Sequence, residues 1–243
     1  MTRRAIIVGA TSGIGRETAR LLLNEGWTLG IAGRREEKLQ EFKALAPERV
    51  FTRVIDIRKE DAPECLSELI AMTGGIDLYL HCSGIGNQNM SLNPVIEINT
   101  LETNGTGFVR MVTAAFNYFK SVGHGHIAVV SSIAGTKGLG TAPSYSATKR
   151  MQNTYIDALE QLAHMQHLDI DFTDIRPGFV ATDLLNDGKN YPMLMKTENV
   201  ARQILYAINH KKRVATIDWR YRMLVLFWRM IPRCVWKRMP VHN

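Results

Sequence analysis

Short apolar runs rich in Ile, Val and Leu alternate along this chain with longer segments of helical periodicity. The runs predict strands at 4–9, 28–32, 50–55, 77–82, 126–131 and 170–175, and the segments predict helices at 13–25, 36–45, 60–72, 98–122 and 144–166. Repeated strand–helix–strand units favour one parallel sheet with right-handed crossovers and helices on both faces. After residue 176 we expect a loop at 177–196, a helix at 198–210, a strand at 213–217 and a C-terminal segment.

The composition suits a single large core. The chain has 243 residues, of which 45% are hydrophobic, so we expect residues 1–243 to form one domain. No apolar run approaches the ~18–20 residues that span a bilayer. Cys65, Cys82 and Cys234 show no paired spacing, which predicts reduced thiols in a cytoplasmic protein with neither a disulfide framework nor a metal site.

The positive charge is concentrated near the C-terminus. Residues 211–238 hold nine Lys or Arg against one acid, Asp218, whereas the rest of the chain holds 21 basic and 22 acidic residues. A nucleic-acid-binding domain usually carries its basic residues on the body of the fold. We therefore expect no nucleic-acid partner.

A glycine-rich segment follows the first predicted strand directly and opens a helix. Its spacing, G-x-x-x-G-x-G, places glycine where backbone must approach a pyrophosphate, with helix N–H groups directed at the anion. A glycine triplet alone is weak evidence, but here a strand and a helix flank it as phosphate binding requires. The predicted contacts are Gly9, Thr11, Ser12, Gly13, Ile14 and Gly15.

The end of the second strand favours NADP over NAD. An acidic residue there would bind the ribose hydroxyls of NAD, but the chain has Arg34 and Arg35, which suit a 2′-phosphate. The alternative is that both arginines begin a solvated helix and that the cofactor is NAD. Asp56, at the end of the third strand, is placed to meet the adenine amino group, with Ile57 beside it.

Tyr145 and Lys149 are four residues apart, so on a helix they lie along one face. A phenol with a reference pKa near ~10 is a poor acid or base at neutral pH. A neighbouring ammonium favours the phenolate, so we expect Lys149 to move the pKa of Tyr145 toward neutrality. Ser132, brought alongside, could bind the same substrate oxygen. By itself this spacing is common by chance.

In combination, these features resemble the short-chain dehydrogenase/reductase family, and the resemblance extends from Ala5 to about Lys212. Its marks, in order, are Gly9/Gly13/Gly15, Asp56, His81-Cys82-Ser83-Gly84, Asn104-Gly105-Thr106-Gly107, Ser131-Ser132, Tyr145/Lys149 and Pro177-Gly178 with Thr182. The resemblance implies a Rossmann-like doubly wound α/β fold with strand order 3-2-1-4-5-6-7. It also implies a homodimer or homotetramer.

The resemblance assigns roles to four catalytic residues. Tyr145 would be the general acid for carbonyl reduction and the base for alcohol oxidation. Ser132 would hold the substrate oxygen and stabilise charge developing on it. Lys149 would lower the pKa of Tyr145 and bind the nicotinamide ribose. Asn104 would hold a water that links Lys149 to solvent.

The resemblance also completes the predicted cofactor site. Thr182 would contact the nicotinamide amide, and Pro177, Gly178 and Val180 would shape that wall. The family usually reads Asn-Asn-Ala-Gly after the fourth strand, where this chain reads His81-Cys82-Ser83-Gly84. That segment, with Ser83 and Gly84, would pass near the adenosine, and we interpret His81 as a structural histidine.

Two segments near the C-terminus concern the substrate and partners. The predicted substrate loop, 183–197, contains Leu, Tyr and Met, which suit a partly apolar ligand or simply pack onto the core. The extension 219–243 reads as a basic amphipathic segment that Pro232 interrupts or restarts. On a helix, Arg222, Arg229 and Arg233 would share one face, and the other would hold Leu224, Phe227, Trp228, Ile231 and Val235. It could cover the pocket, pack on a partner subunit or lie on an anionic membrane, and we expect packing.

We therefore predict an NADP(H)-dependent oxidoreductase that reduces a carbonyl, or oxidises the corresponding alcohol, of a small molecule. One alternative is an NAD-linked dehydrogenase. A second is a non-catalytic dinucleotide-sensing protein, because fold alone does not decide activity. A third, suggested by the basic extension, is a reductase of lipid-like ketones at a membrane surface.

Overall fold

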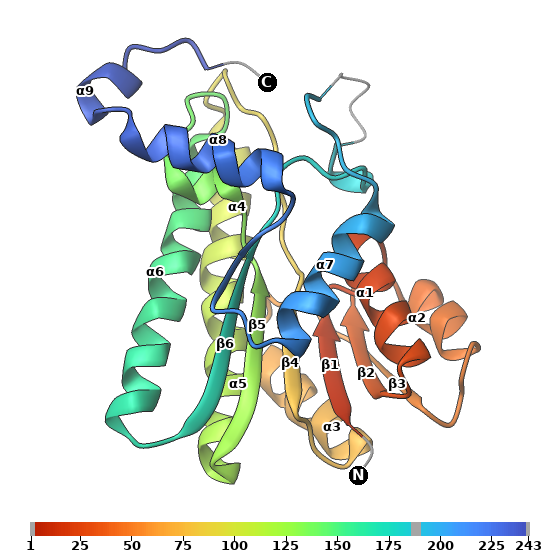
Figure 1. Cartoon of the computed structure of the whole chain (residues 1–243). Coiled ribbons are helices and arrows are strands. Elements are labelled where there is room, and N and C mark those ends of the chain that lie inside the picture. The colour runs from red at the N-terminus through yellow and green to blue at the C-terminus, as the bar shows by residue number, and fades with distance from the viewer. Residues whose placement is uncertain (1–2, 186–190, 242–243) are drawn as a thin grey trace.

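The protein forms one seven-stranded sheet with helices on both faces (Figure 1). The computed structural model describes residues 3–185 and 191–241. The strand order is β3-β2-β1-β4-β5-β6-β7, and all neighbours are parallel. This confirms the predicted doubly wound order. The strands are β1 (Arg4–Val8), β2 (Thr28–Gly33), β3 (Val50–Val54), β4 (Leu78–His81), β5 (His124–Val130), β6 (Asp169–Arg176) and β7 (Val214–Thr216).

Two apolar cores, one on each face of the sheet, hold the helices in place. α1 (Gly13–Asn24), α2 (Glu36–Lys43) and α7 (Thr197–Asn209) cover one face, where Leu22, Phe42 and Ile204 are buried. α3 (Ala62–Thr73), α5 (Phe108–Val122) and α6 (Pro143–Met165) cover the other, where Leu66 and Ile156 are buried. A parallel sheet covered on both faces needs continuous apolar strands, which is why those runs are visible in the sequence.

Where the sequence predicts one helix at 98–122, the structure has three consecutive elements. α4 (Pro94–Leu101) begins four residues earlier than predicted, because Pro94 starts it and the Asn93 side chain accepts a hydrogen bond from the Val95 N–H. A π-helical turn, η1 (Glu102–Gly107), then joins α4 to α5. Such turns are frequent at functional sites, and this one contains Asn104.

The C-terminal segment crosses the carboxyl end of the sheet. α8 (Trp219–Met230) lies over that edge, and α9 (Arg233–Trp236) begins just after Pro232 (Figure 1). Pro232 therefore starts a second helix, because its fixed φ suits a helix N-terminus. No helix in residues 3–185 and 191–241 is long and apolar enough to cross a bilayer.

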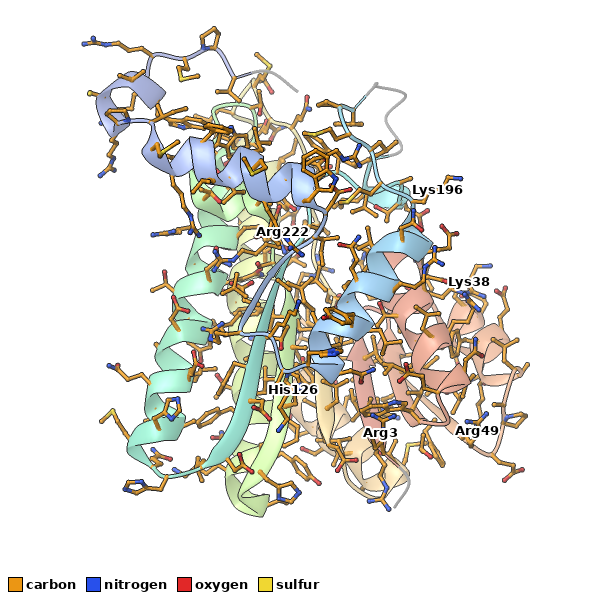
Figure 2. The ribbon with its side chains drawn as sticks, in the orientation of Figure 1. Arg3, Lys38, Arg49, His126, Lys196 and Arg222 are labelled. Atoms are coloured by element: carbon orange, nitrogen blue, oxygen red, sulfur yellow. The ribbon has the colours of Figure 1, made fainter. Side chains whose placement is uncertain are left out.

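The predicted faces of this segment are partly wrong. Tyr221 and Val225 are its inward anchors, whereas Phe227 and Val235 are half-exposed. Arg222 turns back and donates to the Thr216 carbonyl (Figure 2). The prediction grouped residues by polarity on one helical wheel. Val235 lies beyond Pro232, in a second helix, and the contacts with the body set the orientation of α8.

Candidate active site

The carboxyl ends of the strands open onto one cavity of about 800 Å³. It lies where the chain crosses from one side of β1 to the other, which is the place where doubly wound sheets bind ligands. All the predicted cofactor contacts line it: Gly9, Thr11, Ser12, Gly13, Ile14, Gly15, Arg34, Arg35, Asp56, Ile57, Ser83, Gly84, Tyr145, Lys149, Pro177, Gly178, Val180 and Thr182.

The glycine loop is a cradle that side chains would fill. Gly9 and Gly13 have φ values of +93° and +55°, a backbone region that favours glycine. A Cβ on Gly9 would come within 2.6 Å of the Ser83 nitrogen, and one on Gly15 within 2.2 Å of the Gly9 oxygen. Because Ser12 caps α1 without a side-chain hydrogen bond, the first N–H groups of α1 are available to an anion. The loop fits a dinucleotide pyrophosphate.

Arg35 folds onto this loop. Its Nη2 donates to the Thr11 hydroxyl at 2.9 Å and to the Ser12 hydroxyl at 2.6 Å, and Nη1 lies 3.5 Å from the exposed Asp183 carboxylate. Arg34 lines the same end of the cavity without a described carboxylate partner. Two guanidiniums beside the phosphate cradle fit a 2′-phosphate.

Asp56 lines the cavity with its carboxylate paired to a neighbouring arginine, and its predicted contact with the adenine stays a prediction. Arg58 donates to that carboxylate through Nη2 at 2.8 Å and Nε at 3.1 Å, and this hydrogen bonding lowers the pKa of Asp56 to about 2. Arg58 also lines the cavity, so a third guanidinium stands at the adenosine end. The sequence analysis missed Arg58, although it lies two residues beyond a predicted contact.

The segment at the end of β4 contains one buried structural residue, followed by residues that line the cavity. His81 is buried, bonds the Tyr79 hydroxyl through Nδ1 at 2.9 Å and meets the Phe108 ring edge-on. Burial lowers the pKa of His81 to about 3, which keeps it neutral. This packing supports the structural interpretation of His81. Cys82, Ser83 and Gly84 line the cavity, and burial raises the pKa of the Cys82 thiol to about 12.

Ser132 stands at the end of β5, where the chain enters a 3₁₀ turn, η2 (Ile133–Thr136). Its hydroxyl accepts the Ala134 N–H at 3.1 Å and lies 3.4 Å from the Pro177 carbonyl, so its orientation is defined from both sides. Ser131 points the other way. Its hydroxyl donates a hydrogen bond to the buried Asp174 carboxylate.

Tyr145 and Lys149 are one turn apart on α6, and both line the cavity beside Ser132. Burial raises the pKa of Tyr145, and a hydrogen bond with Ser132 partly opposes this. The Lys149 ammonium lies 5.7 Å from the centroid of the phenol ring. In this geometry desolvation of the phenolate is the larger effect on the pKa of Tyr145, and a lowering of that pKa by Lys149 stays a prediction.

Lys149 is held by two acceptors. Its ammonium donates to the Val130 carbonyl and to the Gln152 Oε1, each at 3.1 Å. Burial lowers the pKa of Lys149 to about 8, while Asp174 and Cys82 oppose that shift. The Gln152 amide nitrogen donates to the Asn104 carbonyl at 2.8 Å, so this fully buried side chain joins Lys149 to the π-helical turn. Gln152 was not predicted, since one glutamine on a helix carries no signal of such a link.

Asn104 is fully buried and does not line the cavity. Its side chain accepts the Ile85 N–H at 2.8 Å and donates to the Ile85 carbonyl at 2.7 Å, which anchors the loop after β4. Its backbone carbonyl accepts a hydrogen bond from the Gln152 amide, and the predicted water link from Lys149 to solvent stays a prediction. The observed contacts of Asn104 are thus those of a brace for the cavity wall.

The outer part of the cavity is mostly apolar. Tyr221 connects two segments of the cavity wall. Its hydroxyl accepts a hydrogen bond from the Phe179 N–H at 3.0 Å and donates one to the Pro192 carbonyl at 3.0 Å. Of the predicted substrate loop, residues 186–190 lie outside the described part. The remaining wall includes Leu139, Leu184, Leu185, Tyr191, Met193, Leu224 and Trp228. The C-terminal segment therefore covers the pocket, one of the alternatives that the sequence allowed.

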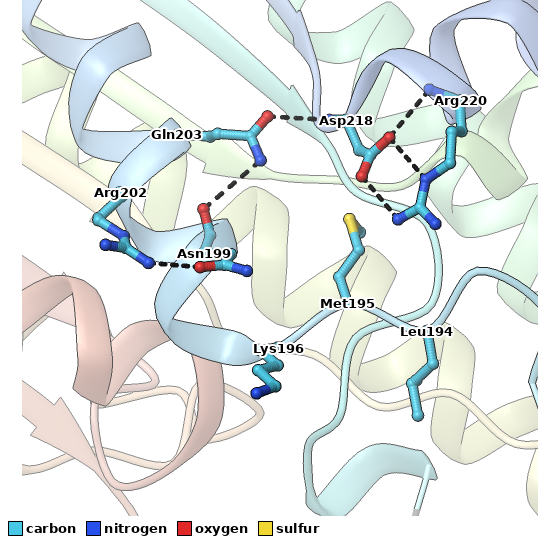
Figure 3. A pocket seen from close by; sticks show the side chains of 8 residues that line it. All are labelled: Leu194, Met195, Lys196, Asn199, Arg202, Gln203, Asp218 and Arg220. Carbon is cyan, nitrogen blue, oxygen red and sulfur yellow. Dashed lines mark hydrogen bonds and ion pairs between the residues drawn. The ribbon is translucent and has the colours of Figure 1, made fainter.

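A second hollow, of about 490 Å³, lies between α7 and the start of α8 (Figure 3). Its side chains are largely engaged with one another. Arg220 pairs with Asp218 at 2.8 Å, and Arg202 bonds the Asn199 side chain. In residues 3–185 and 191–241, no three His, Cys, Asp or Glu side chains gather as metal ligands would. We assign no chemistry to this hollow.

Sequence comparison identifies the class to which this fold and cavity belong. The family model described as short chain dehydrogenase matches residues 3–191. The chain belongs to the short-chain dehydrogenase/reductase family and is an oxidoreductase of the dehydrogenase/reductase type. Dehydrogenase/reductase SDR family member 7B of Bos taurus is 31% identical over 86% of this chain and 71% of that protein. An uncharacterized oxidoreductase of Myxococcus xanthus is 29% identical over 95% of this chain and 93% of that protein.

Solved structures share the fold at lower identity. The closed form of serine dehydrogenase complexed with NADP+ has a TM-score of 0.78 at 22% identity, over 88% of this chain and 93% of that one. ElxO with NADP bound has a TM-score of 0.80 at 21% identity, over 92% and 100%. A variant of actinorhodin polyketide ketoreductase with NADPH has a TM-score of 0.77 at 22% identity, over 89% of this chain and 95% of that one.

Proposed function

We propose that this protein uses NADP(H) to reduce a carbonyl, or to oxidise the corresponding alcohol, of a partly apolar small molecule. One observation carries the proposal. Ser132, Tyr145 and Lys149 open onto the same cavity as the glycine cradle and Arg34/Arg35. Proton-transfer groups and a dinucleotide cradle in one cavity suit hydride transfer to a carbonyl.

The chain's residues would handle the substrate oxygen and its proton. The bound cofactor supplies a hydride to the carbonyl carbon. As negative charge develops on the oxygen, Ser132 donates a hydrogen bond and Tyr145 donates its proton, which leaves a phenolate. The Lys149 ammonium, held by Gln152 and the Val130 carbonyl, stabilises that phenolate. Oxidation of the alcohol reverses these steps.

The preference for NADP is supported by charge. Arg35 lies on the cradle, and Arg34 and Arg58 line the cavity beside it. The NADP-bound proteins that share the fold point in the same direction. Two carboxylates lie at this end, and both are paired: Asp56 with Arg58, and Asp183 with Arg35. We therefore favour NADP over the NAD-linked alternative.

The cofactor proposal is tested by fluorescence titration with NADPH and NADH. We expect NADPH to bind more tightly, and the Arg34→Ala/Arg35→Ala double variant to lose at least tenfold of NADPH affinity, since hydrogen bonds to charged groups contribute about 1.5–3 kcal/mol each. NADH affinity should hardly change. Lys38→Ala, on the helix that follows these arginines but outside the cavity, is the control. An unaltered NADPH-to-NADH preference would show that the arginines are idle and favour the NAD-linked alternative.

The catalytic proposal is tested with Tyr145→Phe, which removes only the phenolic hydroxyl. In a screen of apolar ketones and aldehydes, we expect the variant to bind NADPH normally and to lose turnover by at least ~100-fold, the scale of general acid catalysis. Full turnover in the variant would refute this role for Tyr145. If the wild-type protein binds NADPH but turns over no carbonyl or alcohol, the dinucleotide-sensing alternative is favoured.

Several further assignments accompany this proposal. We propose that residues 1–243 act as one domain, with 183–197 as its substrate loop and 219–243 as a C-terminal extension. Residues 186–190 and 242–243 of these segments lie outside the described part. A cytoplasmic location and a homodimer or homotetramer also remain proposals, and size-exclusion chromatography with light scattering tests the latter.

A further inference from the structure

The side of α8 that faces away from the protein carries large apolar side chains. Its five members are 45–70% exposed, and we call them the outer face. They recur at helical spacing, so they lie along one side of α8. The outer face consists of Trp219, Met223, Leu226, Phe227 and Met230.

Anchoring α8 does not require these residues. The opposite side is already held by the buried Tyr221 and Val225, with Leu224 and Trp228 partly buried beside them. A surface helix normally has one apolar stripe and a polar opposite side. A second apolar stripe of large residues, gathered on one helix, indicates a surface that meets something apolar.

Unpaired positive charge lies beside the outer face. Arg229, Arg233, Lys237 and Arg238 are exposed, and their side chains form no ion pair or hydrogen bond with any residue in 3–185 or 191–241. The other basic residues in this region are engaged. Lys211 pairs with Asp171, Arg213 with Asp157 and Glu160, and Arg220 with Asp218.

We propose that the outer face and these four cations dock the protein on the surface of an anionic lipid bilayer. The apolar side chains would enter the boundary between headgroups and acyl chains, and the cations would meet anionic headgroups. A helix that lies in the interface needs this combination of apolar and basic side chains, with Trp among the former.

Charge argues against a second copy as the occupant. A symmetric contact through the outer face would bring two identical cationic segments together, and residues 211–238 carry nine basic residues against one acid. Like charges facing each other oppose association. An anionic bilayer instead complements both the apolar and the charged part of the surface.

The segment is held rigidly enough to present this surface in a defined orientation. The Trp236 indole N–H donates to the Gly138 carbonyl at 2.8 Å, and Lys137 donates to the Ile231 carbonyl at 2.9 Å. Trp236 also packs against Trp228. Because Leu224 and Trp228 line the cavity from the inner side of α8, docking would bring this wall of the cavity to within about one helix diameter, ~10 Å, of the lipid.

The test is co-flotation of the full chain with vesicles of pure phosphatidylcholine and with vesicles containing phosphatidylglycerol. We expect binding to the anionic vesicles that weakens with salt. Arg229→Gln/Arg233→Gln/Lys237→Gln should weaken it about 100-fold, because each basic residue near an anionic surface strengthens binding roughly fivefold. Lys59→Gln/Lys120→Gln/Arg150→Gln, which removes exposed cations elsewhere, is the matched control and should bind as wild type.

A second matched pair of variants tests the apolar side chains of the outer face. Leu226→Ser/Phe227→Ser should weaken binding at least tenfold, whereas Val95→Ser/Ile98→Ser, at similarly exposed apolar positions on α4, should not. These side chains face solvent, so circular dichroism should show unchanged folding. Equal binding of both variants, or no binding of the wild type to anionic vesicles, would overturn the proposal. A smaller oligomer in Leu226→Ser/Phe227→Ser alone would assign the outer face to a second copy instead.

Insertion depth gives an independent readout. Trp219 is 70% exposed and lies on the outer face. Lipids brominated near the headgroup should quench part of the tryptophan fluorescence of the wild-type protein. In Trp219→Phe that quenching should disappear while vesicle binding persists. Quenching that is identical in both proteins would contradict insertion of the outer face.

Discussion

Loss of the Arg176 guanidinium should destabilise the protein more than any surface charge deletion. Asp174, on β6, has no solvent exposure and accepts Arg176 through Nε at 2.8 Å and Nη2 at 2.6 Å. Asn153 and Ser131 also donate to the Asp174 carboxylate. The network includes Ser131, the residue that precedes Ser132. Arg176→Met keeps an unbranched apolar chain in place but leaves the carboxylate with two donors fewer.

The magnitude follows from these contacts. Hydrogen bonds to a charged group contribute about 1.5–3 kcal/mol each, and breaking a buried ion pair costs about 3–5 kcal/mol. Because Asn153 and Ser131 still solvate the Asp174 carboxylate, we expect the lower part of this range, a loss of about 3 kcal/mol in the free energy of unfolding.

The assay is equilibrium urea unfolding followed by circular dichroism at pH 7, at one protein concentration. With m near ~3 kcal/mol/M, the midpoint should fall by about 1 M. Lys38→Met is the control, since it breaks an ion pair with Glu41 that is 44% and 49% exposed. That change should cost less than about 0.5 kcal/mol. A loss below about 1 kcal/mol in Arg176→Met would refute the argument that the buried pair is essential.

Three further predictions concern pH and packing. Burial lowers the pKa values of His81 and His126 to about 3 and about 4, below the unfolded value of ~6.5. Because the unfolded chain takes up protons more readily at these positions, the free energy of unfolding should be full above pH ~6.5 and should fall by roughly 2 kcal/mol per histidine by pH ~5. His126→Gln should shrink this fall in urea melts at the two pH values, and an undiminished fall would contradict the assignment. Gly178→Ala would place a methyl 2.2 Å from the Tyr221 ring and should lower the melting temperature by several degrees, equivalent to about 1–3 kcal/mol. The methyl group of Gly138→Ala would meet nothing within 4 Å, so this control should keep the wild-type melting temperature. Equal melting temperatures for the two variants would rule out the clash at Gly178. Gln152→Met removes a hydrogen-bond acceptor from the Lys149 ammonium, whose pKa burial lowers to about 8. Because this loss disfavours the charged form, the alkaline limb of the pH–rate profile should move down by about one pH unit. An unshifted limb would show that Gln152 does not act through Lys149.

The strands were predictable to within two residues because most are largely buried apolar runs bordered by polar or glycine positions. The cofactor cradle was predictable for a similar reason. A backbone that must approach a phosphate needs glycine, and Gly9 and Gly15 have no room for a Cβ. Such local constraints leave a trace in the residue types themselves.

The electrostatic partners were not predictable in this way. The pairing of Asp56 with Arg58, the link from Lys149 through Gln152 to Asn104, and the burial that raises the pKa of Tyr145 depend on side-chain packing. Each of these residues is an ordinary helix or loop residue in the sequence. Their roles follow from what lies beside them once distant segments meet.

The sequence by itself determined the doubly wound fold and the dinucleotide cradle of this protein, because periodicity and glycine spacing are local constraints on the backbone. Only the tertiary structure decided how the C-terminal segment is used. The sequence allowed α8 to cover the pocket, to bind a partner or to lie on a membrane. Its contacts with the body turn Tyr221 and Val225 inward and leave Trp219, Leu226 and Phe227 exposed. A helix that is apolar on both sides has no orientation of its own, so the shape of the surface beneath it sets which side is buried.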